Sequence, residues 1–226
     1  MGRKQLGFGF KTPPRRREIK RGRPKKVGAG VSHARRQVAE RHPLHVTLKM
    51  KRHVWQLRSR RCFTALEKAF FAGCRRFGSR LCHFSVQHDH IHLLVEAKDK
   101  VALARALQGL AIRMARGLNR VMGRRGAVFA DRYHARSLRT PTEVRRAIVY
   151  VLGNARKHLV AIGQRPGPGW VDPYSSAVWF QGWASPPDTG PRPDRAPVTL
   201  PETWLLQAGY LRAGGRIRID EAPSGH

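Results

Sequence analysis

The sequence predicts an α+β domain in which helices pack on one antiparallel sheet, with the element order β-α-β-β-α-β-α. Short segments that alternate apolar and polar residues indicate strands, and longer segments with apolar residues every three or four positions indicate helices. Two of the strands are separated by only a short turn, so they must pair as an antiparallel hairpin. This order of elements is typical of a sheet covered by helices.

The first part of this domain contains the hairpin and two helices. Strands are expected at residues 44–50, 81–86 and 91–96, and helices at residues 62–77 and 101–121. The residues Gln87-His88-Asp89 form the expected hairpin turn. Gly78 is expected to stop the first helix, and Asp99 is expected to cap the second.

A strand and a helix complete the predicted domain. Residues 127–138 combine aromatic and apolar side chains without a helical period, which favours a strand. The next residues, Thr140-Pro141-Thr142-Glu143, supply a hydroxyl cap, a proline at the first helical position and a glutamate at the third, as in a capping box. We expect this last helix to run to about His158.

Composition divides the chain into three parts, at residues 1–42, 43–160 and 161–226. The first is a largely disordered arm rich in Lys, Arg, Pro and Gly, a composition that stays extended until it meets phosphate. Its expected DNA contacts are Arg15, Arg16, Arg17, Lys25 and Lys26. The last part is an extension rich in Pro, Gly and Trp, which is expected to dock either on its own domain or on a partner.

The charge of the chain indicates a polyanionic partner. Its 226 residues include 45 Lys and Arg against 14 Asp and Glu, a formal net charge of +31. Nucleic acid is expected because neutralising its phosphates releases counterions. No apolar run is long enough for a membrane span, no secretory signal is recognisable, and the cysteines form no CxxC pattern. We therefore expect a cytoplasmic, nucleoid-associated protein without a membrane partner.

The segment His90-Ile91-His92 is the first candidate site. Residues two apart on a strand point to the same face, about 6–7 Å from each other. Two imidazoles in this position can bind one divalent ion, while Ile91 turns into the core. Taken alone, the motif fits surface or turn histidines more often than metal ligands.

Tyr150 and Asn154 form the second candidate site. On a helix, residues four apart lie on one face, so the hydroxyl and the carboxamide emerge together. An asparagine oxygen is a competent third ligand for Mg²⁺ or Mn²⁺. Taken alone, the pattern more often marks a tyrosine that packs.

Together these motifs resemble those of the HUH-type single-tyrosine transposases, most closely the REP-associated tyrosine transposases. The resemblance covers about residues 43–160 and rests on three segments: residues 84–95, 128–134 and 148–155. The first ends in His-hydrophobic-His and an apolar strand, and the last places an aromatic nucleophile four residues ahead of Asn. Ala155 stands where the family usually has proline, which leaves the ligand spacing intact but lets the helix continue.

The resemblance implies a ferredoxin/RRM-like HUH domain that binds one Mg²⁺ or Mn²⁺ ion. In it His90 and His92 match the metal-binding histidines, Asn154 matches the third ligand, and Tyr150 matches the nucleophile. It implies that the protein cuts single-stranded DNA next to a hairpin through a 5′-phosphotyrosine, which a second 3′-hydroxyl can reverse to join strands. The expected partner is single-stranded or hairpin DNA, and the protein is expected to be a monomer or a homodimer.

Other residues compete for these roles. Tyr133 is a second candidate nucleophile. The arginines that flank it, Arg132 and Arg136, indicate that its segment is better suited to contact phosphate than to supply the nucleophile. His158 lies one further helical turn beyond Asn154 and is an alternative third ligand.

Three other functions are weighed against this one. A non-enzymatic basic protein that binds DNA or RNA fits the charge equally well. Another HUH nuclease, such as a replication initiator or relaxase, would usually place its tyrosine differently or carry a helicase, whose GxxxxGK[ST] motif is absent here. A zinc hydrolase would need HExxH, and a two-metal nuclease would need clustered carboxylates; the sequence has neither between residues 43 and 160.

Overall fold

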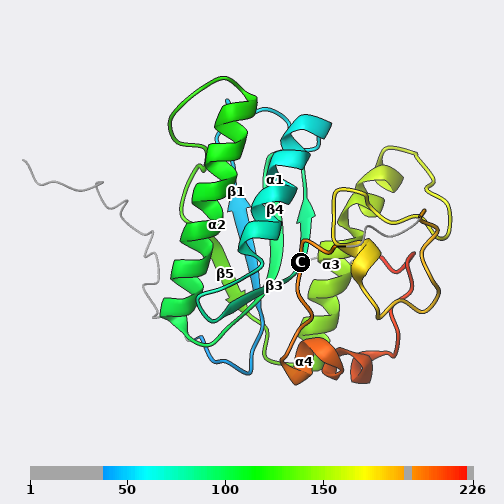
Figure 1. Ribbon diagram of the computed structural model, residues 1–226. Coiled ribbons are helices and arrows are strands. Elements are labelled where there is room, and N and C mark those ends of the chain that lie inside the picture. The colour runs from blue at the N-terminus through cyan, green and yellow to red at the C-terminus, as the bar shows by residue number, and fades with distance from the viewer. Residues whose placement is uncertain (1–37, 191–194, 223–226) are drawn as a thin grey trace, which may run out of the picture. The chain divides into compact units, whose positions relative to one another are not determined.

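A computed structural model describes residues 38–190 and 195–222, which belong to one compact unit. Five antiparallel strands form one sheet with the order β2-β3-β4-β1-β5, and helices cover both of its faces (Figure 1). The strands are β1 (Leu44–Lys49), β2 (Arg75–Arg76), β3 (Ser79–Val86), β4 (His90–Ala97) and β5 (His134–Ser137). The helices are α1 (Arg60–Gly73), α2 (Lys100–Val121), α3 (Pro141–Ala161) and α4 (Trp204–Gln207), with short 3₁₀ segments η1 (Ala177–Trp179) and η2 (Gly209–Ala213). The predicted fold class is confirmed.

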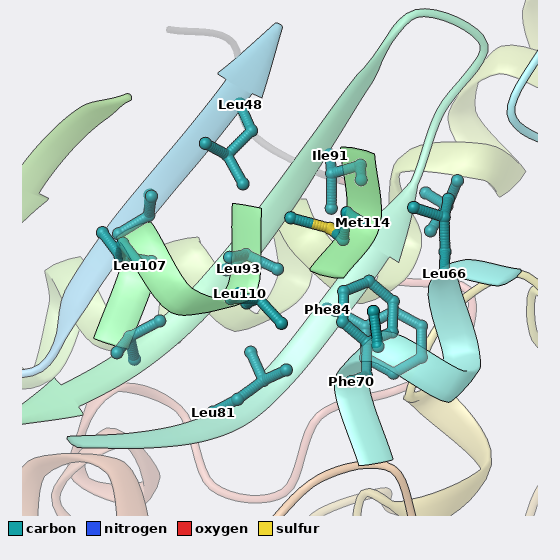
Figure 2. Close-up of a cluster of buried hydrophobic side chains, with 14 of the residues drawn as sticks. Leu48, Leu66, Phe70, Leu81, Phe84, Ile91, Leu93, Leu107, Leu110 and Met114 are labelled. Atoms are coloured by element: carbon teal, nitrogen blue, oxygen red, sulfur yellow. The ribbon is translucent and has the colours of Figure 1, made fainter. Parts of the chain in front are cut away.

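One face of the sheet packs against α1 and α2. Figure 2 shows this core, in which leucines of α2 and Phe70 of α1 meet the strands. The rings of Phe70 and Phe84 lie 4.4 Å apart between their centroids, and both side chains are fully buried. Asp99 caps α2 as expected, because its carboxylate accepts hydrogen bonds from the N–H groups of Val101 and Ala102.

The opposite face packs against α3 and the C-terminal extension. Cys82 and Leu94 from the sheet meet Ile148 of α3 in this second core, which also includes Trp183 and Tyr210 of the extension. The extension therefore docks on its own domain, which sequence reasoning left open. None of the helices in the described residues is long and apolar enough to cross a membrane.

The end of one predicted helix and the length of one predicted strand differ from the structure. The expected first helix ends at Gly73 instead of Phe77, because the chain turns back at Phe77 and Gly78, both with positive φ (56° and 71°), and pairs β2 with β3. The strand expected at 127–138 is reduced to β5. Asp131 breaks it, since its carboxylate accepts a hydrogen bond from the N–H of Arg132 and forms a local turn.

A buried ion pair ties the extension to the start of the domain. Arg58 donates to both carboxylate oxygens of Asp172 at 2.8 Å, and the Asp172 side chain is only 1% exposed. The Arg58 guanidinium also lies over the ring of Tyr174, 4.5 Å from its centroid. The backbone N–H of Val86 donates to the carbonyl of Tyr174, so the extension is bonded to the end of β3.

We expect Asp172→Ala to lower the free energy of unfolding by about 3 kcal/mol, because it leaves Arg58 largely buried without its carboxylate. Urea unfolding measures this loss. The matched control is Asp220→Ala, which removes the carboxylate from an ion pair with Arg218 whose two side chains are 51% and 72% exposed, and it should change stability little. Equal losses in both variants would contradict the assigned role of the buried pair.

His83 should make the fold sensitive to acid. It is 5% exposed on the α3 face of β3, and burial lowers its pKa from the ordinary 6.5 to about 4. Between these values the unfolded chain takes up a proton and the folded protein does not. Stability should therefore fall as pH falls from 6.5 to about 4, by roughly 3 kcal/mol from this residue. Urea unfolding over this range should show a shallower pH dependence in His83→Gln; an unchanged slope would contradict the prediction.

Candidate active site

A cluster of aromatic rings lies between the sheet and α3. The ring of Tyr150 is 5.0 Å from that of His92 and 5.7 Å from that of His45, measured between centroids. The rings of His90 and His92 are 4.7 Å apart, and those of His45 and His92 are 5.1 Å apart. The structure thus brings the predicted tyrosine and both predicted histidines together.

The alternation of side chains along β4 creates this arrangement. Ile91 and Leu93 are fully buried in the core under α1 and α2, as expected for Ile91. His90 and His92, which alternate with these two residues along the strand, therefore face α3. The pairing of β1 with β4 sets Thr47 opposite His92.

Polar partners hold one nitrogen of each predicted histidine ligand. The Nδ1 atom of His92 lies 3.2 Å from Nε2 of His45 and 3.2 Å from Oγ1 of Thr47. The Nδ1 atom of His90 lies 2.7 Å from a carboxylate oxygen of Asp89. This hydrogen bond to His90 is the main reason that the pKa of Asp89 is lowered. Metal-binding histidines typically have one ring nitrogen held by such a partner.

Helix α3 supplies the tyrosine and the asparagine. Its capping box forms as predicted: the Thr140 hydroxyl accepts from the Glu143 N–H, and the Glu143 carboxylate accepts from the Thr140 N–H. Asn154 lies one turn after Tyr150 and is 3% exposed. The helix continues through Ala155 to Ala161, as expected from the missing proline.

The donor types of the three predicted ligands fit a divalent ion in part. Two imidazoles and an amide oxygen are ligand types that Mn²⁺ and Mg²⁺ accept. Among the described residues, no three His, Cys, Asp or Glu side chains are grouped so that they could hold a metal ion. A site here would therefore depend on the carboxamide of Asn154 or on groups from the DNA.

The competing residues are placed elsewhere. Tyr133 packs against the core under α1 and α2, on the opposite side of the sheet from Tyr150. His158 is exposed near the end of α3, whereas Asn154 is buried. Tyr150 thus lies beside the histidines while Tyr133 lies on the other face of the sheet, and Asn154 is the buried one of the two candidate third ligands.

The predicted DNA contacts fall into two groups. Arg132 is exposed in the loop before β5. Arg136 lies on β5 opposite His45 of the neighbouring strand β1, and its guanidinium donates a hydrogen bond to the Glu143 carboxylate at 2.9 Å. Those in the arm, Arg15, Arg16, Arg17, Lys25 and Lys26, lie outside the described residues.

Sequence reasoning missed His45 and Thr47. Both lie in the first predicted strand at alternate positions, so the sequence does indicate that they share a face. The sequence does not show that this strand pairs with β4, and it is this pairing that places the two residues beside His92.

Comparisons with known proteins identify the family of the chain and a shared fold. The family described as IS200-like transposases matches residues 38–151, just over half of the chain. The structure of a REP-associated tyrosine transposase bound to a REP hairpin matches with a TM-score of 0.52 and 15% identity, over 74% of this chain and 97% of that one. A Deinococcus radiodurans R1 protein assigned to the transposases is a more distant match, with a TM-score of 0.37 and 15% identity over 66% of this chain and 100% of that one. No curated protein matches.

The family match defines the protein's class as a transposase, an enzyme that processes DNA. The chain belongs to the IS200-like transposase family. The predicted resemblance to a transposase family is confirmed by this match, and the fold is shared with a REP-associated tyrosine transposase.

Proposed function

We propose that this transposase cuts and rejoins single-stranded DNA next to a hairpin, with Tyr150 as the nucleophile. The observation that carries the proposal is the contact of the Tyr150 ring with His92 and His45, on the side of the sheet that also bears His90. A hairpin substrate is supported by the related fold that was solved with a REP hairpin.

The residues of the chain divide the work. The Tyr150 hydroxyl loses its proton and its oxygen attacks the scissile phosphorus. The bond from phosphorus to the 3′-oxygen breaks, so that one strand leaves with a protonated 3′-hydroxyl and the other remains attached as a 5′-phosphotyrosine. Attack by a second DNA 3′-hydroxyl on this ester releases the tyrosine and joins strands, so no ATP is consumed. Packing between α3 and the sheet holds the Tyr150 ring in place, so less conformational entropy is lost when its oxygen is positioned for the attack.

His90, His92 and Asn154 would hold one Mg²⁺ or Mn²⁺ ion. When bound, such an ion polarises the non-bridging oxygens of the scissile phosphate. Asp89 and the pair Thr47 and His45 orient the two imidazoles through their Nδ1 contacts.

Positive charge supplies most of the DNA affinity in this proposal. Arg132 and Arg136 contact phosphates near the site, and the arm at residues 1–42 adds contacts that are independent of sequence. The protein would act on DNA in the cytoplasm, at the nucleoid.

A covalent adduct tests the proposal. The protein is incubated with Mn²⁺ and a hairpin oligonucleotide that carries a single-stranded flank, labelled on one side or the other of the expected cut. An adduct that survives SDS and retains only the fragment 3′ to the cut is expected. Cleavage without any adduct, or retention of the fragment 5′ to the cut, would contradict the 5′-phosphotyrosine.

A further inference from the structure

Trp55 is a large aromatic side chain that remains exposed at the edge of the domain. It lies in the loop between β1 and α1, and 49% of it is exposed. The guanidinium of Arg61 lies over its indole, 5.9 Å from the ring centroid. Proteins that bind single strands use exposed aromatic rings together with arginines to stack bases.

Hydrogen bonds fix this loop next to the turn that precedes His90. The backbone N–H of Leu57 donates to the carbonyl of His88 at 3.1 Å, and the Gln56 amide lies 2.9 Å from Nδ1 of His88. On its other side, the N–H of Trp55 donates to the sulfur of Met122 at 3.4 Å. The indole is therefore carried by a loop bonded to the β3–β4 turn and to the end of α2. This is the upper end of the sheet in Figure 1.

The segments around Trp55 are strongly basic. Their exposed cationic side chains include Lys49, Lys51, Arg52, Arg61, Arg125 and Arg132. The carboxylates within the same segments, Asp89 and Asp131, already accept hydrogen bonds, from His90 and from the N–H of Arg132. The surface thus combines an aromatic ring on which a base can stack with positive charges that can bind the phosphates of the DNA backbone.

We propose that Trp55 and Arg61 form a stacking platform for a base of the single strand that leads to Tyr150. The platform deepens the proposed function and rests on it for the identity of the strand. Every base has a π-face, so the platform tolerates any sequence. In a duplex the faces are covered by neighbouring pairs, so the platform selects single-stranded DNA.

Binding measurements in a Tyr150→Phe background separate this proposal from cleavage. At salt high enough to weaken the phosphate contacts, Trp55→Ala should bind an oligo(dT) strand about tenfold more weakly, whereas affinity for a duplex of the same length should not change. Trp55→Phe should recover much of the loss, because it keeps a ring. Thermal unfolding confirms that each variant is folded.

Trp204 provides the matched control. It is also 49% exposed and lies under Arg212, whose guanidinium is 5.0 Å from the ring centroid. It belongs to α4, and the preceding Thr203 is bonded to Glu96 at the opposite end of β4 from His90. Trp204→Ala should leave single-strand binding unchanged. An equal loss in both variants, or no loss in Trp55→Ala, would overturn the platform whether or not wild type forms the covalent adduct. A loss confined to Trp55 without any adduct in wild type would support the platform and refute the cleavage.

Discussion

Tyr150→Phe should form no covalent adduct with hairpin DNA, a loss of at least about 1,000-fold, because the phenyl ring keeps the packing but has no oxygen to attack phosphorus. The ring contacts with His92 and His45 should persist, so the fold should not change. Hairpin affinity should also persist, since phosphate contacts supply it. Denaturing gels of labelled DNA measure the adduct, and gel shift measures binding.

Tyr133→Phe is the control for this prediction. Tyr133 is partly buried and packs against the core on the other face of the sheet, so its variant should retain the adduct. An adduct that forms in Tyr150→Phe and disappears in Tyr133→Phe would reverse the assignment of the nucleophile.

Local sequence signals predicted the parts of the site that local geometry determines. Alternation along a strand placed His90 and His92 on one face with Ile91 opposite, and the capping box at Thr140 set the start of α3. A four-residue spacing then placed Tyr150 and Asn154 on one face of that helix. These features depend on residues only a few positions apart.

Contacts between distant segments were not predictable in the same way. His45 meets His92 because β1 joins the sheet beside β4, and alternation within β1 does not say which neighbour it takes. The ion pair of Arg58 with Asp172 joins residues 114 positions apart. The sequence shows only that Asp172 is an acid in a basic chain, and its burial depends on how the extension folds back.

The face on which Tyr133 lies illustrates the same limit. The strand predicted at residues 127–138 did not fix the face to which Tyr133 points, because a shift of one residue in the pairing register moves every side chain to the other face of the sheet. In the structure Ala135 pairs with Val46 and His134 pairs with Thr47, so Tyr133 points to the core and His134 to the α3 side. Register, which the sequence did not show, separates the two candidate nucleophiles.

The two predicted histidine ligands give the second large effect. His90→Ala and His92→Ala should each reduce cleavage by at least about 100-fold, because each removes an imidazole proposed to hold the ion against the scissile phosphate. Hairpin affinity should remain nearly unchanged in both. Single-turnover cleavage with Mn²⁺ measures the first quantity, and gel shift measures the second.

A direct measurement of the ion distinguishes lost binding from a damaged fold. Electron paramagnetic resonance of Mn²⁺ in the presence of hairpin DNA should show one bound ion in wild type and weaker binding in His92→Ala, His90→Ala and Asn154→Ala. His158→Ala is the matched control, because this histidine is exposed near the end of α3, and it should keep both the ion and the activity. Cleavage that continues at full rate in EDTA would refute the role of the ion. If His158→Ala loses the ion and Asn154→Ala keeps it, the third ligand is His158 and not Asn154.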